Sequence, residues 1–112
     1  MQDNCVFCKI ISGKISEKFV YKSANVAVFP DIDPKAPLHL LIIPAKHISQ
    51  FAEISDHDKP IWDEMIKAVH AQIDKHDLKT KGYRIVMNGG PAAMIDHLHI
   101  HLLGEIGKER TV

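Results

Sequence analysis

The segment "DHLHIHLLG", Asp96 to Gly104, constrains the fold more than any other, because three histidines alternate with aliphatic residues. Residues two apart on an α-helix point about 200° from each other, so a helix would scatter His97, His99 and His101 around its axis. On a β-strand the three histidines share one face, roughly 6–7 Å apart, and the aliphatic residues fill the other face. The alternation therefore predicts a strand that packs its aliphatic side on a helix and directs three imidazoles to the opposite surface.

Three imidazoles on one strand face have two chemical interpretations. They could form a three-histidine metal site, as strand histidines do in some zinc enzymes, or a phosphate site in which one imidazole is the nucleophile. An imidazole with a reference pKa of about 6.5 is mostly neutral at pH 7 and is therefore nucleophilic. The spacing alone does not separate the two interpretations.

The rest of the chain predicts an α+β fold in one domain, residues 1–112, with a mostly antiparallel sheet. Strands are expected at residues 18–23, 25–31, 38–44, 82–88 and 96–104. Apolar residues recur at three- and four-residue steps from Pro60 to about Leu78, which predicts one long helix. A short N-terminal helix should end at Gly13.

Charge composition narrows the class of partner. The 112 residues include 14 Lys and Arg against 14 Asp and Glu, so the broad basic surface of a nucleic-acid polymer binder is not expected. No apolar run approaches the ~18 residues of a membrane span, and no signal peptide is evident. We therefore expect a soluble, cytoplasmic protein that binds small ligands or proteins and associates with neither a nucleic-acid polymer nor a membrane.

The two cysteines, Cys5 and Cys8, form one C-x-x-C. In a reducing compartment this spacing indicates a metal site or a redox pair rather than a disulfide framework. Two thiolates supply half of a tetrahedral zinc site, whose other two ligands would come from the eight histidines. The alternatives are free thiols packed as small hydrophobic side chains, and a thioredoxin-like redox pair, which the lack of a preceding strand disfavours.

Four sequence blocks in a fixed order resemble the histidine triad (HIT) family, in the branch of nucleotide-binding hydrolases similar to nucleoside phosphoramidases. The blocks are "CVFCKIISGKI", "FPDIDPKAPLHLLIIPAKHIS", "GYRIVMNGG" and "HLHIHLL". The resemblance runs over nearly the whole chain and implies a HIT-like fold, a five-stranded antiparallel sheet with a helix packed on it, usually assembled as a homodimer. It also implies a purine nucleotide or nucleotide conjugate as the ligand.

The resemblance further implies a nucleotidyl hydrolase or transferase that acts at an α-phosphate through a nucleotidyl-histidine intermediate. His99 matches the nucleophile, His101 a donor to a phosphate oxygen, and His39 a fourth histidine that orients the triad. Asp31 matches the acid that binds the ribose hydroxyls, and Asn88 would help to position the phosphate. The apolar positions that match the clamp around the base are Phe7, Ile10, Phe29, Ile32 and Leu41.

Several of these residues also have a purely structural interpretation. His39 would suit a half-buried strand position, with its ring satisfied by a backbone carbonyl. Asp31 would suit a turn residue that caps the "DIDP" loop. The apolar clamp residues, Phe7 and Ile10 above all, would suit the core.

In zinc-bearing members of the family the four ligands match Cys5, Cys8, His47 and His97. This set leaves His99 free as the nucleophile, so the metal and phosphate interpretations of the triad are compatible. By this resemblance zinc would be structural and would clamp the N-terminal helix to the triad strand.

The sequence departs from the family just before the triad, where "GGPAAMID" replaces a longer loop. Met94 stands where a serine would donate to the leaving group, and a thioether has no hydrogen to donate. Three functions therefore stay open: hydrolysis of phosphoramidates or adenylates, hydrolysis of dinucleoside polyphosphates, and nucleotide or zinc binding with little turnover.

Overall fold

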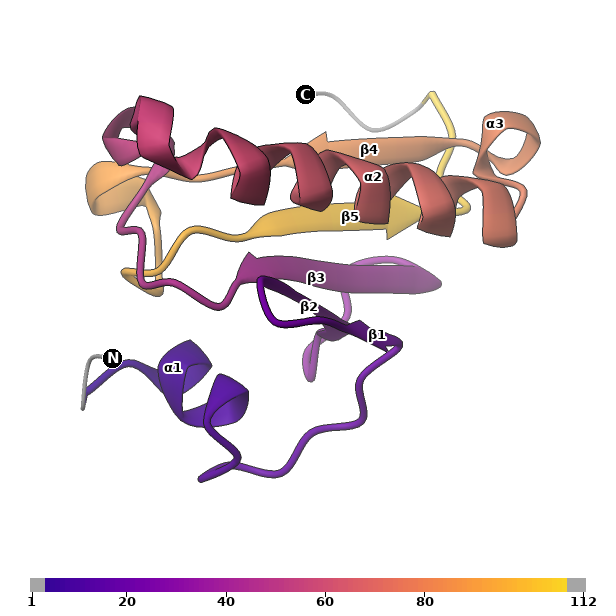
Figure 1. Ribbon diagram of the computed structural model, residues 1–112. Coiled ribbons are helices and arrows are strands. Elements are labelled where there is room, and N and C mark those ends of the chain that lie inside the picture. The colour runs from indigo at the N-terminus through magenta and orange to yellow at the C-terminus, as the bar shows by residue number, and fades with distance from the viewer. Residues whose placement is uncertain (1–3, 109–112) are drawn as a thin grey trace.

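The computed structural model describes residues 4–108, which form a five-stranded antiparallel sheet with strand order β1-β2-β3-β5-β4 (Figure 1). The strands are β1 (Tyr21–Lys22), β2 (Val26–Pro30), β3 (Leu38–Pro44), β4 (Tyr83–Val86) and β5 (Ile100–Gly104). The helices are α1 (Val6–Ile11), α2 (Lys59–Lys75) and α3 (Leu78–Lys81), with short 3-10 turns at Phe51–Glu53, Asp56–Asp58 and Gly90–Ala92. The predicted α+β fold, with one long helix and a short N-terminal helix, is confirmed.

The central strands are apolar on both faces, because helices pack on both sides of the sheet. Along β2, Val26 and Val28 belong to the core beneath α2, whereas Ala27 and Phe29 belong to the core beneath α1. This alternation continues along β3, since successive side chains of a strand point to opposite faces. The functional residues described below lie on the α1 face.

Helix α2 has Pro60 in its first turn, where the missing N–H is tolerated, and buries Met65, Val69 and Ile73 against the sheet. The turn before it is tied to the loop after β3, because Lys46 Nζ lies 2.6 Å from the Asp58 carboxylate. The helix ends at Lys75, three residues before the predicted end. Its continuation stops because Asp77 adopts a left-handed conformation with φ 55°.

The histidine segment is a strand only in its second half. A strand is predicted from Asp96, but β5 begins at Ile100. The neighbouring strand β3 ends at Pro44, which has no N–H for a further ladder bond, and the Pro44 carbonyl accepts a hydrogen bond from the His97 ring at 2.8 Å. The Leu98 N–H donates to the Ile48 carbonyl in the loop after β3. These bonds replace the ladder and hold the segment before β5.

The triad does not face an outer surface, which corrects a second expectation. His97 has no exposed area and His99 is 6% exposed, because α1 covers this part of the sheet. The Phe7 ring of α1 packs edge-on against both imidazoles, with ring centroids 5.7 Å from His97 and 5.1 Å from His99. The imidazoles therefore lie in an interior layer, and His101, which is half-buried, lies nearest to solvent.

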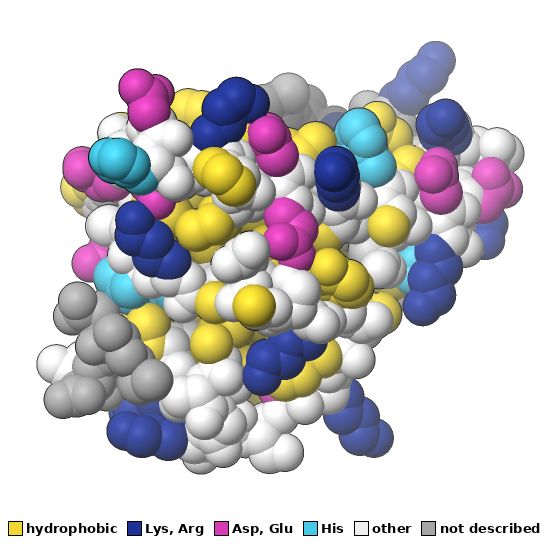
Figure 2. Space-filling view, in the orientation of Figure 1, with side chains coloured by type: hydrophobic (Ala, Val, Ile, Leu, Met, Phe, Trp, Pro, Cys, Tyr) yellow, Lys and Arg dark blue, Asp and Glu magenta, His cyan; other side chains and the backbone are white. Residues whose placement is uncertain are grey.

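On the face seen in Figure 2, Lys and Arg side chains are interspersed with Asp and Glu, without a continuous region of one sign. This distribution agrees with the balanced charge of the sequence. Across residues 4–108, no helix combines the length and the apolar character that crossing a membrane requires.

Candidate active site and metal centre

A pocket of about 510 Å³ opens on the α1 face of the sheet. Its volume lies in the usual range for small-molecule sites, which combine an apolar wall with a few convergent polar groups. Here the convergent groups include His39, His99, His101, Asp31 and Asn88.

Sheet register explains why these groups meet. His39 of β3 is paired with Leu103 and His101 of β5 with Leu41, so the two histidines are diagonal neighbours on one face. Val86 of β4 is paired with His101, and the alternation of the strand carries Asn88, two residues later, to the same face. Three strands thus deliver polar side chains to one pocket.

The backbone beside His99 selects the tautomer of its ring. Its Nδ1 lies 2.6 Å from the carbonyl oxygen of His97. A carbonyl only accepts, so Nδ1 carries the proton and Nε2 carries the lone pair of the neutral ring. The unprotonated nitrogen belongs to an imidazole that lines the pocket, which is the arrangement a nucleophile or a metal ligand needs.

A chain of hydrogen bonds selects the other tautomer for His39 and His101, with the ring proton on Nε2 instead of Nδ1. The backbone N–H of Lys35 donates to His39 Nδ1 at 3.0 Å, so the proton of the neutral His39 ring is on Nε2. His39 Nε2 lies 2.9 Å from His101 Nδ1 and donates to it. His101 consequently carries its own proton on Nε2. His101 is therefore a donor, whereas His99 has a lone pair on the same nitrogen.

Burial keeps these rings neutral. Burial lowers the pKa of His39, although the nearby Asp31 opposes the change. Burial, reinforced by the neighbouring His99 and His39, lowers the pKa of His101 to about 4. Both imidazoles are therefore neutral at pH 7, and the tautomers deduced above apply there.

The structure places some of the expected ligand residues on the pocket wall and others elsewhere. The pocket wall includes Phe7, Asp31, Leu41 and Asn88, together with the histidines His39, His99 and His101. Ile10 and Phe29 do not line it, because they are buried in the core beneath α1, where the Phe29 and Phe7 rings are 5.9 Å apart. Ile32 does not line it either, since its side chain is 99% exposed on the loop after β2.

The pocket also contains residues that the sequence analysis did not select. Val86 and Leu103 line it. Both could have been predicted from strand alternation, because Val86 lies two residues before Asn88 and Leu103 two residues after His101. Asp33 and Lys35 line it from the loop between β2 and β3, where no periodicity in the sequence indicates which way a side chain points. Met94, which the sequence analysis noted as a departure from the family, also lines the pocket and is 98% exposed.

Four other side chains converge beside α1. Cys5 Sγ lies 3.2 Å from His97 Nδ1, and Cys8 Sγ lies 3.3 Å from His47 Nδ1 and 3.6 Å from His97 Nδ1. All four ligand atoms lie within 4.8 Å of one another. Around a tetrahedral zinc ion with usual bond lengths, sulfur and nitrogen ligands are about 3.6 Å apart. This cluster could hold a metal ion, and its two sulfur and two nitrogen donors are the set that favours zinc.

The protonation of His97 fits metal binding. Its Nε2 donates to the Pro44 carbonyl at 2.8 Å, which leaves the lone pair on Nδ1, the atom that faces both sulfurs. Burial lowers the pKa of His97 to about 4, so the ring is neutral at pH 7, as a ligand must be. Burial also raises the pKa of the Cys5 thiol, so a thiolate there requires a neighbouring cation such as a metal ion.

Asp31, His39 and His101 also bring ligand atoms within 4.8 Å of one another, but their protonation does not fit a metal ion. His39 Nε2, which would face the ion, carries the ring proton because Nδ1 accepts from the Lys35 N–H. Moving that proton to Nδ1 would set two donors against each other. Hydrogen-bond direction thus separates a metal-type cluster from a phosphate-type cluster on the same face.

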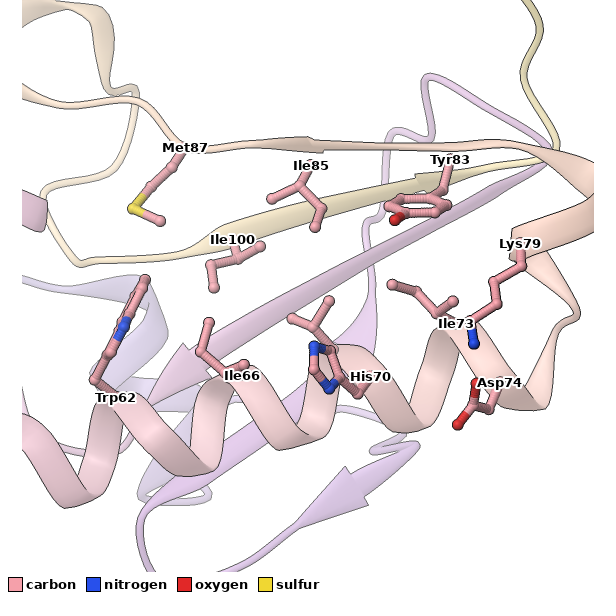
Figure 3. Close-up of a pocket in the computed structure, with 11 residues that line it drawn as sticks. Trp62, Ile66, His70, Ile73, Asp74, Lys79, Tyr83, Ile85, Met87 and Ile100 are labelled. Carbon is pink, nitrogen blue, oxygen red and sulfur yellow. The ribbon is translucent and has the colours of Figure 1, made fainter.

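A second groove lies on the opposite face, between α2 and the edge strand β4 (Figure 3). Tyr83, Ile85 and Met87 point from β4 and its continuation toward α2, with Met87 at the Trp62 end of the groove and Tyr83 at the Ile73 end. The groove has a volume of about 430 Å³, and Tyr83 and Ile85 are 45% and 47% exposed. Within residues 4–108 the outer edge of β4 pairs with no other strand, so this groove combines an open strand edge with exposed apolar side chains and differs chemically from the histidine pocket.

Fold and site together define the class of protein: an antiparallel sheet in which a histidine triad joins a polar pocket to a cysteine–histidine cluster. Comparison with known proteins gives the family. A family model described as "Scavenger mRNA decapping enzyme C-term binding" matches residues 4–111. Protein HitA of Neisseria gonorrhoeae is 38% identical over 104 residues, covering 91% of this chain and 96% of HitA.

An uncharacterized HIT-like protein of Buchnera aphidicola is 40% identical over 108 residues, covering 93% of each chain. Among solved structures, a HIT family hydrolase from Clostridium thermocellum aligns with a TM-score of 0.92 and 36% identity, over 100% of this chain and 99% of that one. A HIT family hydrolase from Legionella pneumophila aligns with a TM-score of 0.88 and 37% identity, over 93% of this chain and 95% of that one. The chain belongs to the histidine triad (HIT) family.

Proposed function

We propose that this protein is a nucleotidyl hydrolase or transferase that acts at the α-phosphate of purine nucleoside phosphoramidates or adenylates, with His99 as the nucleophile. The observation that carries the proposal is the 2.6 Å bond from His99 Nδ1 to the His97 carbonyl. It leaves Nε2 unprotonated in a ring that lines the ligand pocket. Hydrolases of known structure that resemble this chain support an enzyme of this kind.

The reaction proceeds in two displacements. His99 Nε2 forms a bond to the α-phosphorus, while the bond from phosphorus to the leaving group breaks; the leaving group departs with the electron pair and takes one proton from solvent. A water oxygen then bonds to phosphorus, the bond from phosphorus to Nε2 breaks with its electron pair returning to nitrogen, and the proton of the water goes to solvent. The products are a nucleoside monophosphate and the protonated leaving group.

His101 and Asn88 stabilise the charge on phosphorus. The relay from the Lys35 N–H through His39 gives His101 an Nε2 proton, which donates to a non-bridging oxygen. A donor held in place before the reaction costs no reorganisation when charge develops on that oxygen. His39 acts through His101 and is a positioning residue in this scheme.

In this proposal Asp31 binds the hydroxyl groups of the ribose. Its Oδ1 accepts the Asp33 N–H at 2.8 Å, so it caps the loop, and its Oδ2 lies 3.4 Å from His39 Nε2. A carboxylate can accept further hydrogen bonds from a vicinal diol, because each oxygen has two lone pairs. The turn role and the ribose role are therefore compatible. Phe7 and Leu41 supply apolar surface for the base.

We also propose that Cys5, Cys8, His47 and His97 hold a structural zinc ion. The ion would supply folding free energy by joining α1 to the loop after β3 and to the segment before β5. Catalysis would use the neighbouring residue His99 and would not pass through the metal.

We propose a homodimer formed through β4. This edge strand carries no sheet partner on its outer side within the described residues. Two copies related by a two-fold axis can pair β4 with β4 antiparallel, which closes the edge and covers Tyr83 and Ile85. Trp62 and Ile66 would extend the same apolar contact from α2.

Turnover of adenosine 5′-phosphoramidate tests the proposed reaction. The wild type should release AMP, and His99→Ala should lose this activity while retaining its fold and its AMP affinity. His57→Ala is the matched control, because His57 is exposed on the turn before α2, and it should keep full activity. A wild type that binds AMP tightly without turnover would refute the enzyme and support a nucleotide-binding protein.

A further inference from the structure

Two adjacent glycines, Gly89 and Gly90, follow Asn88 at the start of the loop before the triad, and both contact Gln50 of the loop after β3. The Gly90 N–H donates to Gln50 Oε1 at 3.0 Å. At Gly89 a Cβ would lie 2.9 Å from the same oxygen, closer than a side-chain carbon can approach, so glycine lets the backbone pass over the Gln50 amide. Gly90 also needs glycine for its own conformation, with φ 57°. The glycine pair therefore fits the loop to the Gln50 side chain.

The far end of this loop is held by the two residues that precede Gln50. Ser49 Oγ donates to the Asp96 carboxylate, at the last residue before the triad. The Ile48 carbonyl accepts the Leu98 N–H at 2.6 Å, inside the triad segment. The loop is thus tied to one short segment at both ends, and the end next to the phosphate-binding residues depends on Gln50.

Asn88 lies between the sheet and the bond to Gln50. Strand β4 ends at Val86, two residues earlier, so the ladder with β5 does not extend to Asn88. The next anchor along the chain is the Gly90 N–H, two residues later. Each residue between the two anchors has two soft backbone dihedrals, and a hydrogen bond from the Asn88 amide weakens steeply when its angle changes. Gln50 is not among the described residues that line the pocket, whereas Asn88 is.

We propose that Gln50 is a positioning residue, which fixes the backbone at Gly90 and thereby holds the Asn88 amide toward the phosphate of a bound nucleotide. The inference rests on the proposed function, in which Asn88 contacts that phosphate. Gln50 acts through Asn88 and touches no ligand atom. A donor that is already in place when the phosphate arrives needs no ordering on binding, so the bond to Gly90 increases affinity for the phosphate and not for the rest of the nucleotide.

Calorimetric titration with AMP and with adenosine tests the proposal, because the ratio of the two affinities reports the phosphate contacts alone. The wild type should prefer AMP by about a hundredfold, since His101 and Asn88 each donate one hydrogen bond to a charged group, about tenfold apiece. Gln50→Met keeps the side-chain length and removes the acceptor; it should lower the ratio to about tenfold and leave adenosine affinity within about twofold. Gln50→Glu should retain most of the ratio, because a carboxylate oxygen can accept the Gly90 N–H. Asn88→Ala should match Gln50→Met, and the double variant should lose no more than Asn88→Ala alone.

Gly89→Ala tests the same contact from the other side. Its φ of −140° suits alanine, but the new Cβ must displace the Gln50 amide, so the ratio should fall as in Gln50→Met. Gln72→Met is the matched control, because it makes the same replacement in α2, on the opposite face of the sheet, and it should keep the ratio. An unchanged ratio in Gln50→Met, an equal loss of affinity for both ligands, or a loss that adds to that of Asn88→Ala would overturn the role of Gln50 and leave the proposed function intact. A wild type that binds AMP no more tightly than adenosine would overturn both.

Discussion

Identical side chains on one face of the sheet have different chemistry because their hydrogen-bond partners differ. The His97 carbonyl leaves His99 with a lone pair on Nε2, whereas the Lys35 N–H and the His39 ring leave His101 with a proton there. The Pro44 carbonyl gives His97 the tautomer opposite to that of His99, with its proton on Nε2 and its lone pair on Nδ1 toward the cysteines. The roles proposed for the three rings, as nucleophile, donor and metal ligand, thus rest on three backbone contacts.

The low pKa of His101 predicts how stability depends on pH. Its ordinary value is 6.5 and its value in the fold is about 4. Between these limits the unfolded chain binds more protons than the folded one, so the free energy of unfolding rises with pH from about 4 to about 6.5. Urea unfolding of His101→Gln over this range should show a shallower rise than the wild type, and the exposed-site variant His57→Gln should match the wild type. Equal slopes for His101→Gln and the wild type would contradict the assignment.

Asp31 predicts a preference for ribonucleotides. Loss of one hydrogen bond to a charged acceptor costs roughly 1.5–3 kcal/mol, about tenfold to a hundredfold in affinity. AMP should therefore bind more tightly than its 2′-deoxy analogue. Asp31→Asn should reduce this difference without unfolding the loop, since the amide oxygen can still accept the Asp33 N–H. Calorimetry that gives equal affinities of the wild type for the two nucleotides would show that Asp31 is only a turn residue.

Among the helices and strands, α1 depends most on its side-chain contacts for stability. Its six residues are too few for a stable isolated helix, and it is held on the sheet by Phe7, Ile10 and the cysteine–histidine cluster. The same helix covers the triad and lines the ligand pocket with Phe7. The proposed zinc ion is therefore expected to support the site indirectly, by keeping α1 in place.

Replacement of Cys5 with serine tests that dependence. Cys5→Ser should lower the free energy of unfolding by at least about 2 kcal/mol, because loss of a structural metal is among the most destabilising single changes. A chelator should destabilise the wild type similarly and leave Cys5→Ser nearly unchanged. Metal analysis should find about one zinc per wild-type chain. Chelator-insensitive stability of a metal-free wild type would show that the cysteines are packed thiols.

Element types could be predicted from the sequence more reliably than their ends. The two-residue and helical periodicities predict the five strands, the long helix and the short N-terminal helix. The start of β5 could not be predicted, because it depends on how Pro44, Ile48 and the His97 ring share backbone hydrogen bonds across distant segments. Tertiary packing also decides that the Ile32 side chain points to solvent and that Phe29 is buried in the core. Apolar character alone does not specify either outcome.

At the scale of the whole molecule, the two faces of the sheet have different surroundings. One face carries α1, the pocket and the cysteine–histidine cluster, while the other carries α2 and the apolar groove beside β4. An exposed strand edge next to exposed apolar side chains is a ready template for pairing with a second chain. The proposed dimer would cover the groove and leave the ligand pocket on the other face of the sheet.

Light scattering tests the assembly. The wild type at micromolar concentration should have twice the mass of the 12.6 kDa chain. Ile85→Glu should shift it toward the monomer, because it places a charge in the apolar contact. Ile15→Glu is the control, since Ile15 is exposed at 37% but lies outside the groove. A monomeric wild type would contradict the proposed interface.

The central claim is that His99 becomes covalently bound to the nucleotide. The most direct measurement is mass spectrometry of protein quenched during turnover of adenosine 5′-phosphoramidate, with fragmentation that assigns the added group to one residue. The proposed mechanism predicts one adenylyl group on His99, lost on continued incubation with water and absent from His99→Ala. An adenylyl group on His97, His101 or any other residue, or turnover by His99→Ala at the wild-type rate, would contradict it.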